Sequence, residues 1–429
     1  MPRTLQLLPV PTGDRVLELI PGLRSAMAGT GPVLLPVPEY DETETARLAT
    51  SLAAGTAMAD GEDDPHDPTA LVVGTSGSTG NPKGALLPAS ALIASAEATR
   101  DRLASHRVGG RPGHWLLCLS ATHIAGLQVL LRAVAEGTAP TVLDTAPPFT
   151  AERFVAAVER MPSGSRFTSL VPTQLLRVLT DPDATTALTT FDAVLVGGAS
   201  TPLALLDDAA QAGVRAVTTY GMSETCGGCV YDGVPLHRVT LSIDESADTS
   251  GTPVDPPGRV SVTGPVVARG YRDLPRHPSF RRLPGERYRT FLTGDLATRR
   301  GGRWQVVGRV DDVITTGGIK IDPAVVESVL VRVTGVREVI VTGVPDPDWG
   351  EAVVAVVVPA ADGPPALDTL RRAAGYAHGP AAAPKQLILL DELPIRGPGK
   401  PDRAAIRQLA AAELAARALT GSGPPRLTW

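Results

Sequence analysis

The sequence has few cysteines, no long apolar run and no excess of basic residues, and each shortage excludes a class of protein. Its three cysteines, Cys118, Cys226 and Cys229, are an odd number and imply no disulfide framework. The longest apolar run, Ala352–Ala361, is about half as long as a membrane-spanning helix and predicts a buried strand instead. Lysine plus arginine number 40 and aspartate plus glutamate 45, so the net charge of −5 does not favour a nucleic-acid partner.

The length and composition predict a globular protein. The 429 residues suffice for two or three domains at roughly 100–200 residues each. An apolar fraction of 43% is too high for a disordered chain and supports sizeable cores. The N-terminus lacks the long apolar core of a signal peptide. We therefore expect a cytosolic protein with no membrane partner.

Cys226 and Cys229 form a Cys-x-x-Cys pattern, CGGC. A redox or metal role would need a thioredoxin-like βαβ context or a second pair of ligands. Neither is visible, because Cys118 stands alone and no histidine follows at ligand spacing. The pattern favours two small residues in a glycine-rich loop, and metal analysis of the pure protein would decide the alternative.

Apolar runs alternate with helical stretches up to about Ser250, which predicts an α/β architecture layered around a largely parallel sheet. The expected strands are Thr69–Gly74, Trp115–Leu119, Phe167–Val171, Ala193–Val196 and Ala216–Thr219. The expected helices are Leu86–Leu103, Gly126–Val134, Glu152–Arg160 and Ala204–Ala212. Ahead of them, the acidic segment Asp60–Pro68 predicts a solvated loop.

The pattern changes after about Ser250, where short strands separated by glycine and proline predict a small β-rich subdomain. These strands are Arg259–Thr263, Tyr288–Leu292 and Trp304–Val307. From Asp312 onward a compact α+β unit is expected. Its predicted elements are the helices Pro323–Val333, Leu367–Ala374 and Arg403–Ala418 and the strands Val339–Val344 and Ala352–Val358.

Residues 74–84, GTSGSTGNPKG, form a loop rich in glycine and hydroxyl groups. Glycines let the backbone approach a phosphate, N–H groups and hydroxyls donate hydrogen bonds to it, and a lysine adds positive charge. The loop is not a Walker A motif, because Asn81 and Pro82 separate the last glycine from Lys83. It follows an apolar strand, and we expect a helix after it. The candidate phosphate-binding residues are Thr75, Ser76, Gly77, Ser78, Thr79, Gly80 and Lys83.

This loop resembles the phosphate loop of the adenylate-forming superfamily, which includes acyl-CoA synthetases, adenylation domains of peptide synthetases and luciferases. Further segments resemble signatures of that superfamily and follow in its order. They are Gly197-Gly198-Ala199, Tyr220-Gly221-Met222-Ser223-Glu224, Thr293-Gly294-Asp295, residues 308–323 (GRVDDVITTGGIKIDP) and residues 394–403 (PIRGPGKPDR). The resemblance covers about three quarters of the chain, from residue 74 to residue 403.

The resemblance implies an α/β fold with a large N-terminal domain, residues 1–308, made of layered α/β subdomains and a small β-rich subdomain. A hinge at residues 309–312 would lead to a small mobile α+β C-terminal domain, residues 313–429. The phosphate loop comes earlier in this chain than in the superfamily, which predicts a shortened N-terminal subdomain. That region supports the acid pocket and often a dimer interface, so a homodimer is left open.

The resemblance also implies roles for single residues. The nucleotide would lie against Gly197, Gly198, Ala199, Thr219, Tyr220, Gly221 and Met222. Ser223 would contact the α-phosphate, and Glu224 would help to hold Mg²⁺. Asp295 and Arg309 would bind the ribose. The remaining assignments are the hinge at Asp311, the channel for the pantetheine arm of CoA at Gly317 and Gly318, and the catalytic lysine at Lys400.

The implied reaction joins a carboxylic acid to the thiol of coenzyme A in two steps. The carboxylate attacks the α-phosphate of ATP and releases pyrophosphate, and CoA then displaces AMP from the acyl-adenylate. Two anions meet in the first step, so charge neutralisation and positioning do most of the catalysis. Lys83, Mg²⁺ near Glu224, and Lys400 would supply the positive charge. In the superfamily the C-terminal domain then rotates and withdraws the lysine.

The acid itself is predicted from three further likenesses. Thr122–Val134 resembles the superfamily segment that borders the acid pocket, which makes His123, Arg132 and Thr225 candidates for contact with the acid. That segment, Thr219–Gly233 and the stretch LPIRGPGK most resemble o-succinylbenzoate–CoA ligases of menaquinone biosynthesis.

Alternatives stay open at this point. Another aryl- or alkyl-CoA ligase and an adenylation enzyme that loads a carrier protein are possible on the same motifs. A luciferase-type oxygenation rests on fold alone. A non-catalytic nucleotide sensor should have lost Lys83, Glu224 or Lys400, and all three are present.

Overall fold

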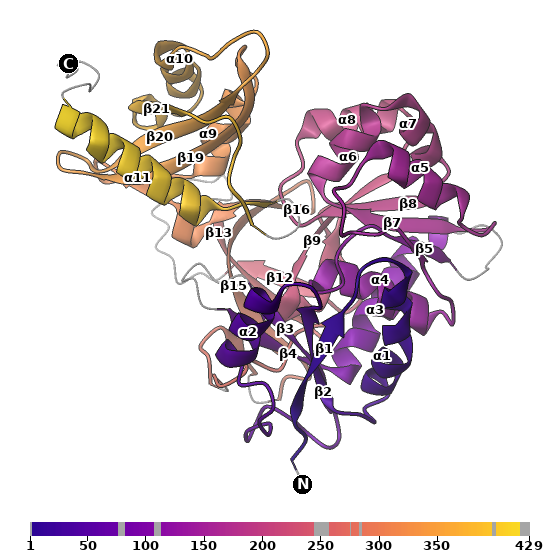
Figure 1. The fold of residues 1–429 in the computed structure, drawn as a ribbon. Helices are drawn as coiled ribbons and strands as arrows, with labels where there is room; N and C mark the ends of the chain where they lie inside the picture. The colour runs from indigo at the N-terminus through magenta and orange to yellow at the C-terminus, as the bar shows by residue number, and fades with distance from the viewer. Residues whose placement is uncertain are drawn as a thin grey trace. The chain divides into compact units, whose positions relative to one another are not determined.

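The computed structural model describes residues 2–75, 82–106, 113–243, 257–274, 276–282, 285–396 and 400–420, and Figure 1 traces them. Contacts within the chain divide it into two compact units. Unit 1 comprises Met1–Ser242 and Ser261–Thr293, and unit 2 comprises Ile243–Val260 and Gly294–Trp429. Among the described helices, none combines the length and the apolar character needed to span a bilayer.

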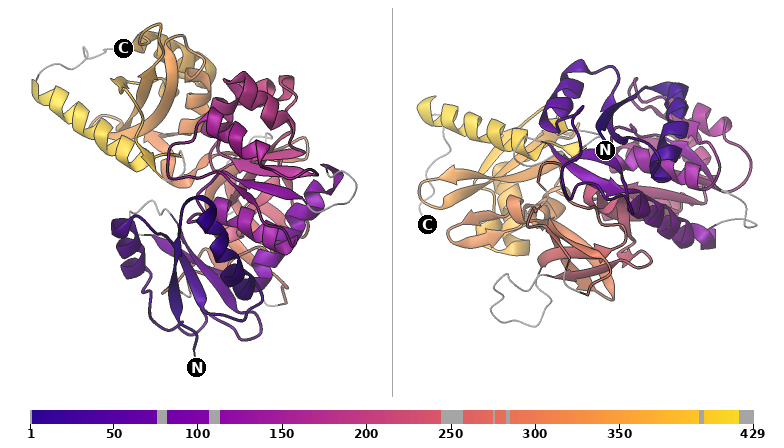
Figure 2. Two further views of the ribbon diagram at one scale, coloured as in Figure 1. Left: turned by 45° about the vertical axis from the view of Figure 1, so that its right-hand side comes forward. Right: turned by 90° about the horizontal axis from the view of Figure 1, so that it is seen from below.

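Unit 1 begins with a four-stranded sheet in the order β1-β2-β3-β4. Its strands are β1 (Leu5–Val10), β2 (Val33–Pro38), β3 (Thr69–Thr75) and β4 (Lys83–Pro88). The first three are parallel, and β4 is antiparallel to β3. Helices α1 (Ile20–Met27) and α2 (Glu42–Ser51) lie on opposite sides of this sheet (Figure 1, Figure 2). Because both faces are covered, β2 and β3 are apolar almost throughout.

The phosphate loop lies between two antiparallel strands, not between a strand and a helix. The expected helix Leu86–Leu103 is wrong at its start, because the buried run up to Pro88 belongs to β4 and the helix, α3, spans Ala89–Leu103. Pro88 ends the strand and stands at the N-cap of α3. Residues 76–81 lie outside the described part of the chain, and so do the roles predicted for Ser76, Gly77, Ser78, Thr79 and Gly80.

The second sheet of unit 1 has the order β11-β10-β9-β8-β7-β5-β6. Strands β9 through β6 in that order are parallel, as the alternation of runs predicts, and β10 and β11 are antiparallel additions at one edge. The strands are β5 (His114–Leu117), β6 (Thr141–Val142), β7 (Arg166–Leu170), β8 (Ala193–Gly197), β9 (Ala216–Met222), β10 (Gly227–Tyr231) and β11 (Val234–Pro235).

Helices cover both faces of this sheet (Figure 1). α3 and α4 (Ile124–Ala135) lie on one face. On the other lie α5 (Ala151–Glu159), α6 (Pro172–Leu179), α7 (Pro182–Thr189) and α8 (Leu203–Gln211). Their core joins Phe154 and Leu175 of the helices to Val194 of β8. The predicted strands of this sheet and three of its helices, α4, α5 and α8, are confirmed.

A smaller sheet contains the predicted β-rich strands, in the order β12-β13-β15-β14 with β16 beside β15. The strands are β12 (Thr240–Ile243), β13 (Gly258–Gly264), β14 (Phe280–Arg281), β15 (Arg289–Arg300) and β16 (Arg303–Arg309). Short 3₁₀ turns elsewhere in the chain are Gly13–Leu19, Ala104–His106, Ser223–Thr225, Val310–Asp312 and Pro380–Ala382.

Unit 2 is built around β20, a strand that is buried on both faces. Val353, Ala355 and Val357 pack into one core with α9 and α10, and the alternate residues Val354 and Val356 pack into another with α11. This explains the continuous apolar run and confirms it as a strand. The elements are β17 (Ile314–Thr316), β18 (Ile319–Ile321), α9 (Pro323–Leu330), β19 (Val336–Asp346), β20 (Gly350–Pro359), α10 (Leu367–His378), β21 (Gln386–Leu389), β22 (Ile395–Arg396), β23 (Lys400–Pro401) and α11 (Arg403–Thr420).

The acidic loop Asp60–Pro68 is exposed at Asp60, Gly61, Pro65 and His66, as the prediction of a solvated loop requires, but Glu62 departs from it. Glu62 is fully buried and receives hydrogen bonds from buried Arg272 and from the backbone N–H of Ala59. Asp63 pairs with Arg3 at 2.8 Å. Glu62 and Arg272 are 210 positions apart in the chain. Local composition therefore predicts the polar loop, whereas it does not predict that Glu62 is buried against a distant arginine.

Candidate active site

Two of the predicted nucleotide segments meet at the carboxyl ends of neighbouring strands. Gly197 ends β8 and pairs with Thr219 of β9, and β9 runs on to Met222. The 3₁₀ turn Ser223–Thr225 then leads into β10. Ligands of open α/β sheets bind outside the carboxyl ends of the strands. The half-buried side chains of Tyr220, Met222 and Ser223 lie at this edge.

Two glycines of these segments are required by the strand packing. A Cβ on Gly197 would lie 2.2 Å from the hydroxyl oxygen of Thr219, and a Cβ on Gly221 would lie 2.0 Å from the carbonyl oxygen of Gly227. Beyond β8, Gly198 takes a positive φ of 85°, and Ala199 after it is exposed. The backbone of Gly198 and Ala199 is therefore not covered by a large side chain at the point where the resemblance places the adenine.

Thr225 holds the turn together through its hydroxyl group, which is buried. This hydroxyl accepts a hydrogen bond from the N–H of Met222 at 3.0 Å and donates one to the carbonyl of Gly227 at 2.8 Å. The side chain predicted to contact the acid is thus bonded to backbone groups. Its place in the structure is that of a brace for Ser223 and Glu224.

Glu224 is buried and faces a residue that the sequence patterns did not single out. The hydroxyl of Tyr271 donates a hydrogen bond of 2.6 Å to its carboxylate. The backbone is fixed as well, because the N–H of Ala268 donates to the carbonyl of Glu224 at 2.8 Å. The carboxylate thus has a defined direction at the end of β9.

Lys83 lies beside the same tyrosine. Its ammonium nitrogen is 5.3 Å from the centre of the Tyr271 ring and 3.3 Å from Nε2 of His277. Sequence reasoning missed Tyr271 and His277, because Lys83 and His277 are 194 positions apart and no spacing rule joins them. The sole local signal was an aromatic residue between two arginines, Arg269-Gly270-Tyr271-Arg272.

The residues present fit a magnesium ion that arrives with a nucleotide. Mg²⁺ keeps several waters and is commonly bound through one or two carboxylates plus substrate phosphates. Glu224 would provide one carboxylate, and Lys83 contacts the same tyrosine. Within the described residues, no group of three or more histidine, cysteine or acidic side chains forms a metal cage. The donor set therefore suits an ion held partly by phosphate.

The two remaining acid candidates differ in exposure. His123 is exposed at the N-cap of α4, directly after the loop that follows β5. Arg132 is 5% exposed, lies over the ring of Trp115 at 5.1 Å and donates to the hydroxyl of Tyr231 at 3.2 Å. Its side chain is packed between α4 and the sheet, so we do not propose that it contacts the substrate.

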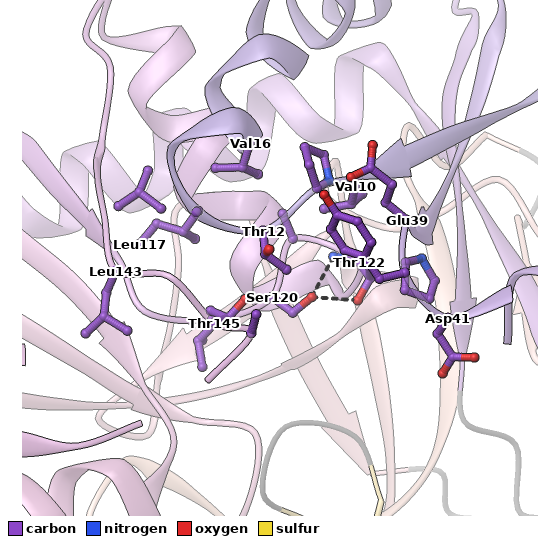
Figure 3. A pocket seen from close by; sticks show the side chains of 18 residues that line it. Val10, Thr12, Val16, Glu39, Asp41, Leu117, Ser120, Thr122, Leu143 and Thr145 are labelled. Atoms are coloured by element: carbon purple, nitrogen blue, oxygen red, sulfur yellow. Dashed lines mark hydrogen bonds between the residues drawn. The ribbon is translucent and has the colours of Figure 1, made fainter. Parts of the chain in front are cut away.

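A cavity of about 350 Å³ opens where β1, β2, β5 and β6 end. Figure 3 shows apolar side chains, such as Leu117 and Leu143, at one end and Glu39 and Asp41 at the other. Hydroxyl groups line the middle, where Ser120 and Thr122 are 2.8 Å apart. Its described lining carries two carboxylates and no basic side chain. The cavity therefore does not favour an anionic ligand.

Unit 2 brings together the two residues predicted to bind the ribose. Arg309 donates to the carboxylate of Asp295 at 2.8 Å, where β15 and β16 pair. Gly294 leaves room for this contact, because a Cβ there would lie 2.7 Å from the Arg309 guanidinium. Asp311, the predicted hinge, is exposed in the following 3₁₀ turn.

Gly317 and Gly318 form the tight turn between β17 and β18. Both have positive φ, 57° and 79°, which a two-residue hairpin of this type requires. Trp349 packs beneath Gly317, where a Cβ would lie 2.8 Å from its ring. The backbone of Lys400 pairs with Arg396 in the hairpin β22–β23, and nothing is described of its side chain.

The three cysteines are buried, and none of them is in a disulfide bond. Burial raises the pKa of Cys118 to about 12 and raises that of Cys226 above its ordinary value. Thiols of this kind are poor nucleophiles and poor metal ligands. Cys226 and Cys229 are small buried residues, but the predicted glycine-rich loop is wrong, because Gly227–Tyr231 form β10 and pair with β9.

Asp322 of unit 2 carries a partly buried carboxyl group with a raised pKa. One oxygen caps α9 by accepting from the N–H of Ala324 at 2.9 Å, and the other has no hydrogen-bond partner. Burial raises the pKa of this group from 3.8 to about 6. Between these two values the folded state binds a proton that the unfolded state lacks. The contribution of this group to the free energy of unfolding is therefore lost as the pH rises from 4 to 6.

We expect Asp322→Asn to raise the melting temperature at pH 7.5 but not near pH 4, because asparagine keeps the helix cap and cannot ionise. Thermal unfolding at both pH values measures the difference. Asp402→Asn, at the cap of α11, is the matched control for the cap itself. An equal shift at both pH values for Asp322→Asn would contradict the account of its carboxyl group.

Two family comparisons match most of the chain. The sequence model described as AMP-binding enzyme matches residues 21–272, and the one described as AMP-binding enzyme C-terminal domain matches residues 325–400. The first match contains the phosphate loop, the motif at Glu224 and Tyr271. The second ends at Lys400.

Relatives and solved structures agree with these matches. A probable 2-succinylbenzoate–CoA ligase from Mycobacterium tuberculosis is 42% identical over 404 residues, which is 94% of this chain and 97% of that protein. A feruloyl-CoA synthase from an Amycolatopsis species is 34% identical, covering 89% of this chain and 80% of that protein. The fold is shared with o-succinylbenzoate CoA synthetase (MenE) from Bacillus subtilis, solved with its acyl-adenylate intermediate, at a TM-score of 0.72 and 23% identity over 94% of this chain and 88% of that one.

Proposed function

We propose that the acid that this chain activates is 2-succinylbenzoate, also called o-succinylbenzoate. The chain belongs to the AMP-binding enzyme family and is an AMP-forming acyl-CoA ligase. The product would be 2-succinylbenzoyl-CoA, formed for menaquinone biosynthesis. One observation carries the proposal: the 42% identity, over nearly the whole of both chains, to a probable ligase of this acid. The feruloyl-CoA synthase is more distant, at 34%.

In the proposed reaction, unit 1 holds the triphosphate. Lys83 places a positive charge at the end of the phosphate loop, and Thr75 ends the strand that enters it. Ser223 donates to the α-phosphate from the turn that Thr225 braces. Mg²⁺ bound near Glu224 would neutralise phosphate charge. The adenine binds against the backbone of Gly198 and the side chain of Tyr220.

Unit 2 supplies the remaining groups in this proposal. Asp295 accepts hydrogen bonds from the ribose hydroxyls while Arg309 holds its carboxylate. Lys400 bridges the acid and the α-phosphate as the new P–O bond forms and pyrophosphate leaves. Coenzyme A then attacks the acyl carbon, loses its thiol proton and displaces AMP. Gly317 and Gly318 line its path.

The acid itself is proposed to lie near His123. This residue is exposed at the start of α4, in the segment that resembles the border of the acid pocket, and an imidazole can donate a hydrogen bond to a second carboxylate or a keto group. The cavity at β1 and β5 is not proposed as the acid site, because no basic side chain lines it, Asp41 is acidic, and Arg15 beside it is paired with Glu39 at 2.8 Å.

Pyrophosphate release with ATP, Mg²⁺ and CoA tests the proposal. The acids are 2-succinylbenzoate, ferulate, benzoate and a medium-chain fatty acid. We expect CoA-dependent turnover with the first at a kcat/KM at least tenfold above the others. Preference for ferulate or for the fatty acid would overturn the choice of acid and leave the ligase. Transfer to a phosphopantetheinyl carrier protein in preference to CoA would favour the adenylation alternative.

A further inference from the structure

The segment Arg269–Arg272 is anchored on both sides of Tyr271. Arg272 is 4% exposed and hydrogen-bonds to Glu62, to the hydroxyl of Thr56 at 2.6 Å and to two backbone carbonyls. Arg269 donates to the carbonyl of Asp67 and to the hydroxyl of Thr69 at 3.1 Å. The acidic loop and the residues around it thus hold an arginine on each side of Tyr271.

The backbone of this segment is also paired with β4. The N–H of Leu86 donates to the carbonyl of Gly270 at 2.9 Å, and the N–H of Arg272 donates to that of Gly84 at 2.8 Å. Tyr271 forms an isolated bridge with Ala85 between them. Because β4 begins at Lys83, the position of Tyr271 is fixed relative to that lysine.

The ring of Tyr271 contacts three functional or titratable groups. Its hydroxyl donates to Glu224 at 2.6 Å, its face lies 5.3 Å from the Lys83 ammonium, and the ring of His277 meets it edge-on at 4.9 Å and 90°. A cation over a tyrosine ring is attracted by the ring quadrupole. One side chain thus lies between a carboxylate and an ammonium group.

His277 completes the arrangement as a neutral ring. The Lys83 ammonium lies 3.3 Å from Nε2, and the backbone N–H of Ser279 lies 3.3 Å from Nδ1. Both groups are donors, and an imidazolium ring has no acceptor, so the ring is neutral. Nε2 accepts from Lys83 in the tautomer with its proton on Nδ1, and Nδ1 accepts from Ser279 in the other tautomer. Burial and the charge of Lys83 both lower the pKa of His277. At neutral pH the histidine therefore does not repel the lysine.

We infer that Tyr271 is a positioning residue for both Glu224 and Lys83. His277 holds Lys83 beside the Tyr271 ring until Lys83 binds a triphosphate. The inference rests on the proposed nucleotide role of these two groups and adds two residues that no motif assigns. The physical reason is preorganisation: the hydrogen bonds that anchor residues 269–272 orient groups that act on a nucleotide.

Tyr271→Phe tests the link to Glu224, because it removes the hydroxyl and keeps the ring. Calorimetry of ATP binding, with and without Mg²⁺ and in the absence of acid and CoA, measures the effect. Losing a hydrogen bond to a charged group should weaken binding of the magnesium complex by about 10–100-fold and leave metal-free ATP nearly unchanged. Tyr376→Phe, at a tyrosine that is 97% exposed, is the matched control.

The titration of His277 tests the link to Lys83 and needs no active enzyme. NMR of the histidine ring protons, assigned with His277→Gln, gives its pKa in the native protein and in Lys83→Met. We expect the pKa to rise toward the ordinary histidine range once the lysine charge is gone, and to rise also when MgATP draws Lys83 away.

The outcomes separate this inference from the proposed function. Equal loss of ATP binding with and without Mg²⁺ in Tyr271→Phe would show a merely structural tyrosine and overturn the inference. An unchanged His277 pKa in Lys83→Met would overturn it as well, and this result decides the matter if Tyr271→Phe does not fold. A native protein that binds MgATP but activates no acid would overturn the proposed function alone.

Discussion

Lys400→Ala should lower acid-dependent pyrophosphate release by about 10²–10³-fold, the usual cost of losing a donor aimed at transition-state charge. The reason is electrostatic. A carboxylate and an α-phosphate repel each other, and a cation between them offsets that repulsion as the P–O bond forms. The lysine acts on charge that is greatest in the transition state, so kcat should fall more than the affinity for ATP.

The second half-reaction provides the internal check. If the lysine leaves the site before CoA attacks, Lys400→Ala should still convert a supplied acyl-adenylate to the acyl-CoA at close to the native rate. Lys320→Ala, at an exposed lysine of β18, is the matched control for adenylation measured without CoA. Near-native pyrophosphate release by a folded Lys400→Ala protein would remove this lysine from the mechanism.

Glu62→Ala should destabilise unit 1 by about 3–5 kcal/mol, the cost of leaving a buried charge without its partner. Arg272 would keep its positive charge in the interior with the hydroxyl of Thr56, the carbonyls of Leu52 and Ala57 and, at 3.8 Å, the exposed carboxylate of Asp273 as its remaining neighbours. The N–H of Asp273, which donates to Glu62 at 2.5 Å, would lose its acceptor too. Urea unfolding followed by circular dichroism measures the change.

The control variants separate charge from packing. Glu97→Ala, at an exposed position of α3, should change the free energy of unfolding by less than about 0.5 kcal/mol. Glu62→Leu combined with Arg272→Met removes both charges and should recover much of the loss, since apolar replacement of a buried pair is often neutral. If the double variant is no more stable than Glu62→Ala, the pair matters for its shape and not for its charge.

The sequence predicts the strands whose burial depends on their own residues. β8 and β9 are short apolar runs that end at glycine or at a motif, and both lie where the runs place them. β4 was missed because Leu86 and Leu87 fit a helix period as well as a strand, and its pairing with β3 decides between them. Local pattern cannot weigh a partner strand on the far side of a loop.

The residues of the candidate site also differ in whether the sequence predicts them. Glu224, Lys83 and Asp295 belong to motifs whose order along the chain identifies them. Tyr271 reaches Glu224 across 47 positions, and Glu62 reaches Arg272 across 210. These contacts exist only once the two sheets of unit 1 have formed. Single-sequence reasoning therefore finds the groups proposed to touch the nucleotide more readily than those that hold them in place.

The glycine in Tyr-Gly-Met-Ser-Glu has a consequence for how such motifs are used in searches. Gly221 is required by the carbonyl of Gly227 on the neighbouring strand, 2.0 Å from where its Cβ would be, before any nucleotide binds. A pattern that demands this glycine selects for a close approach of two backbones, while the serine and the glutamate are the residues proposed to carry the chemistry. Proteins that keep the glycine and lose the glutamate would be found by the same pattern with their scaffold intact and the proposed metal ligand gone.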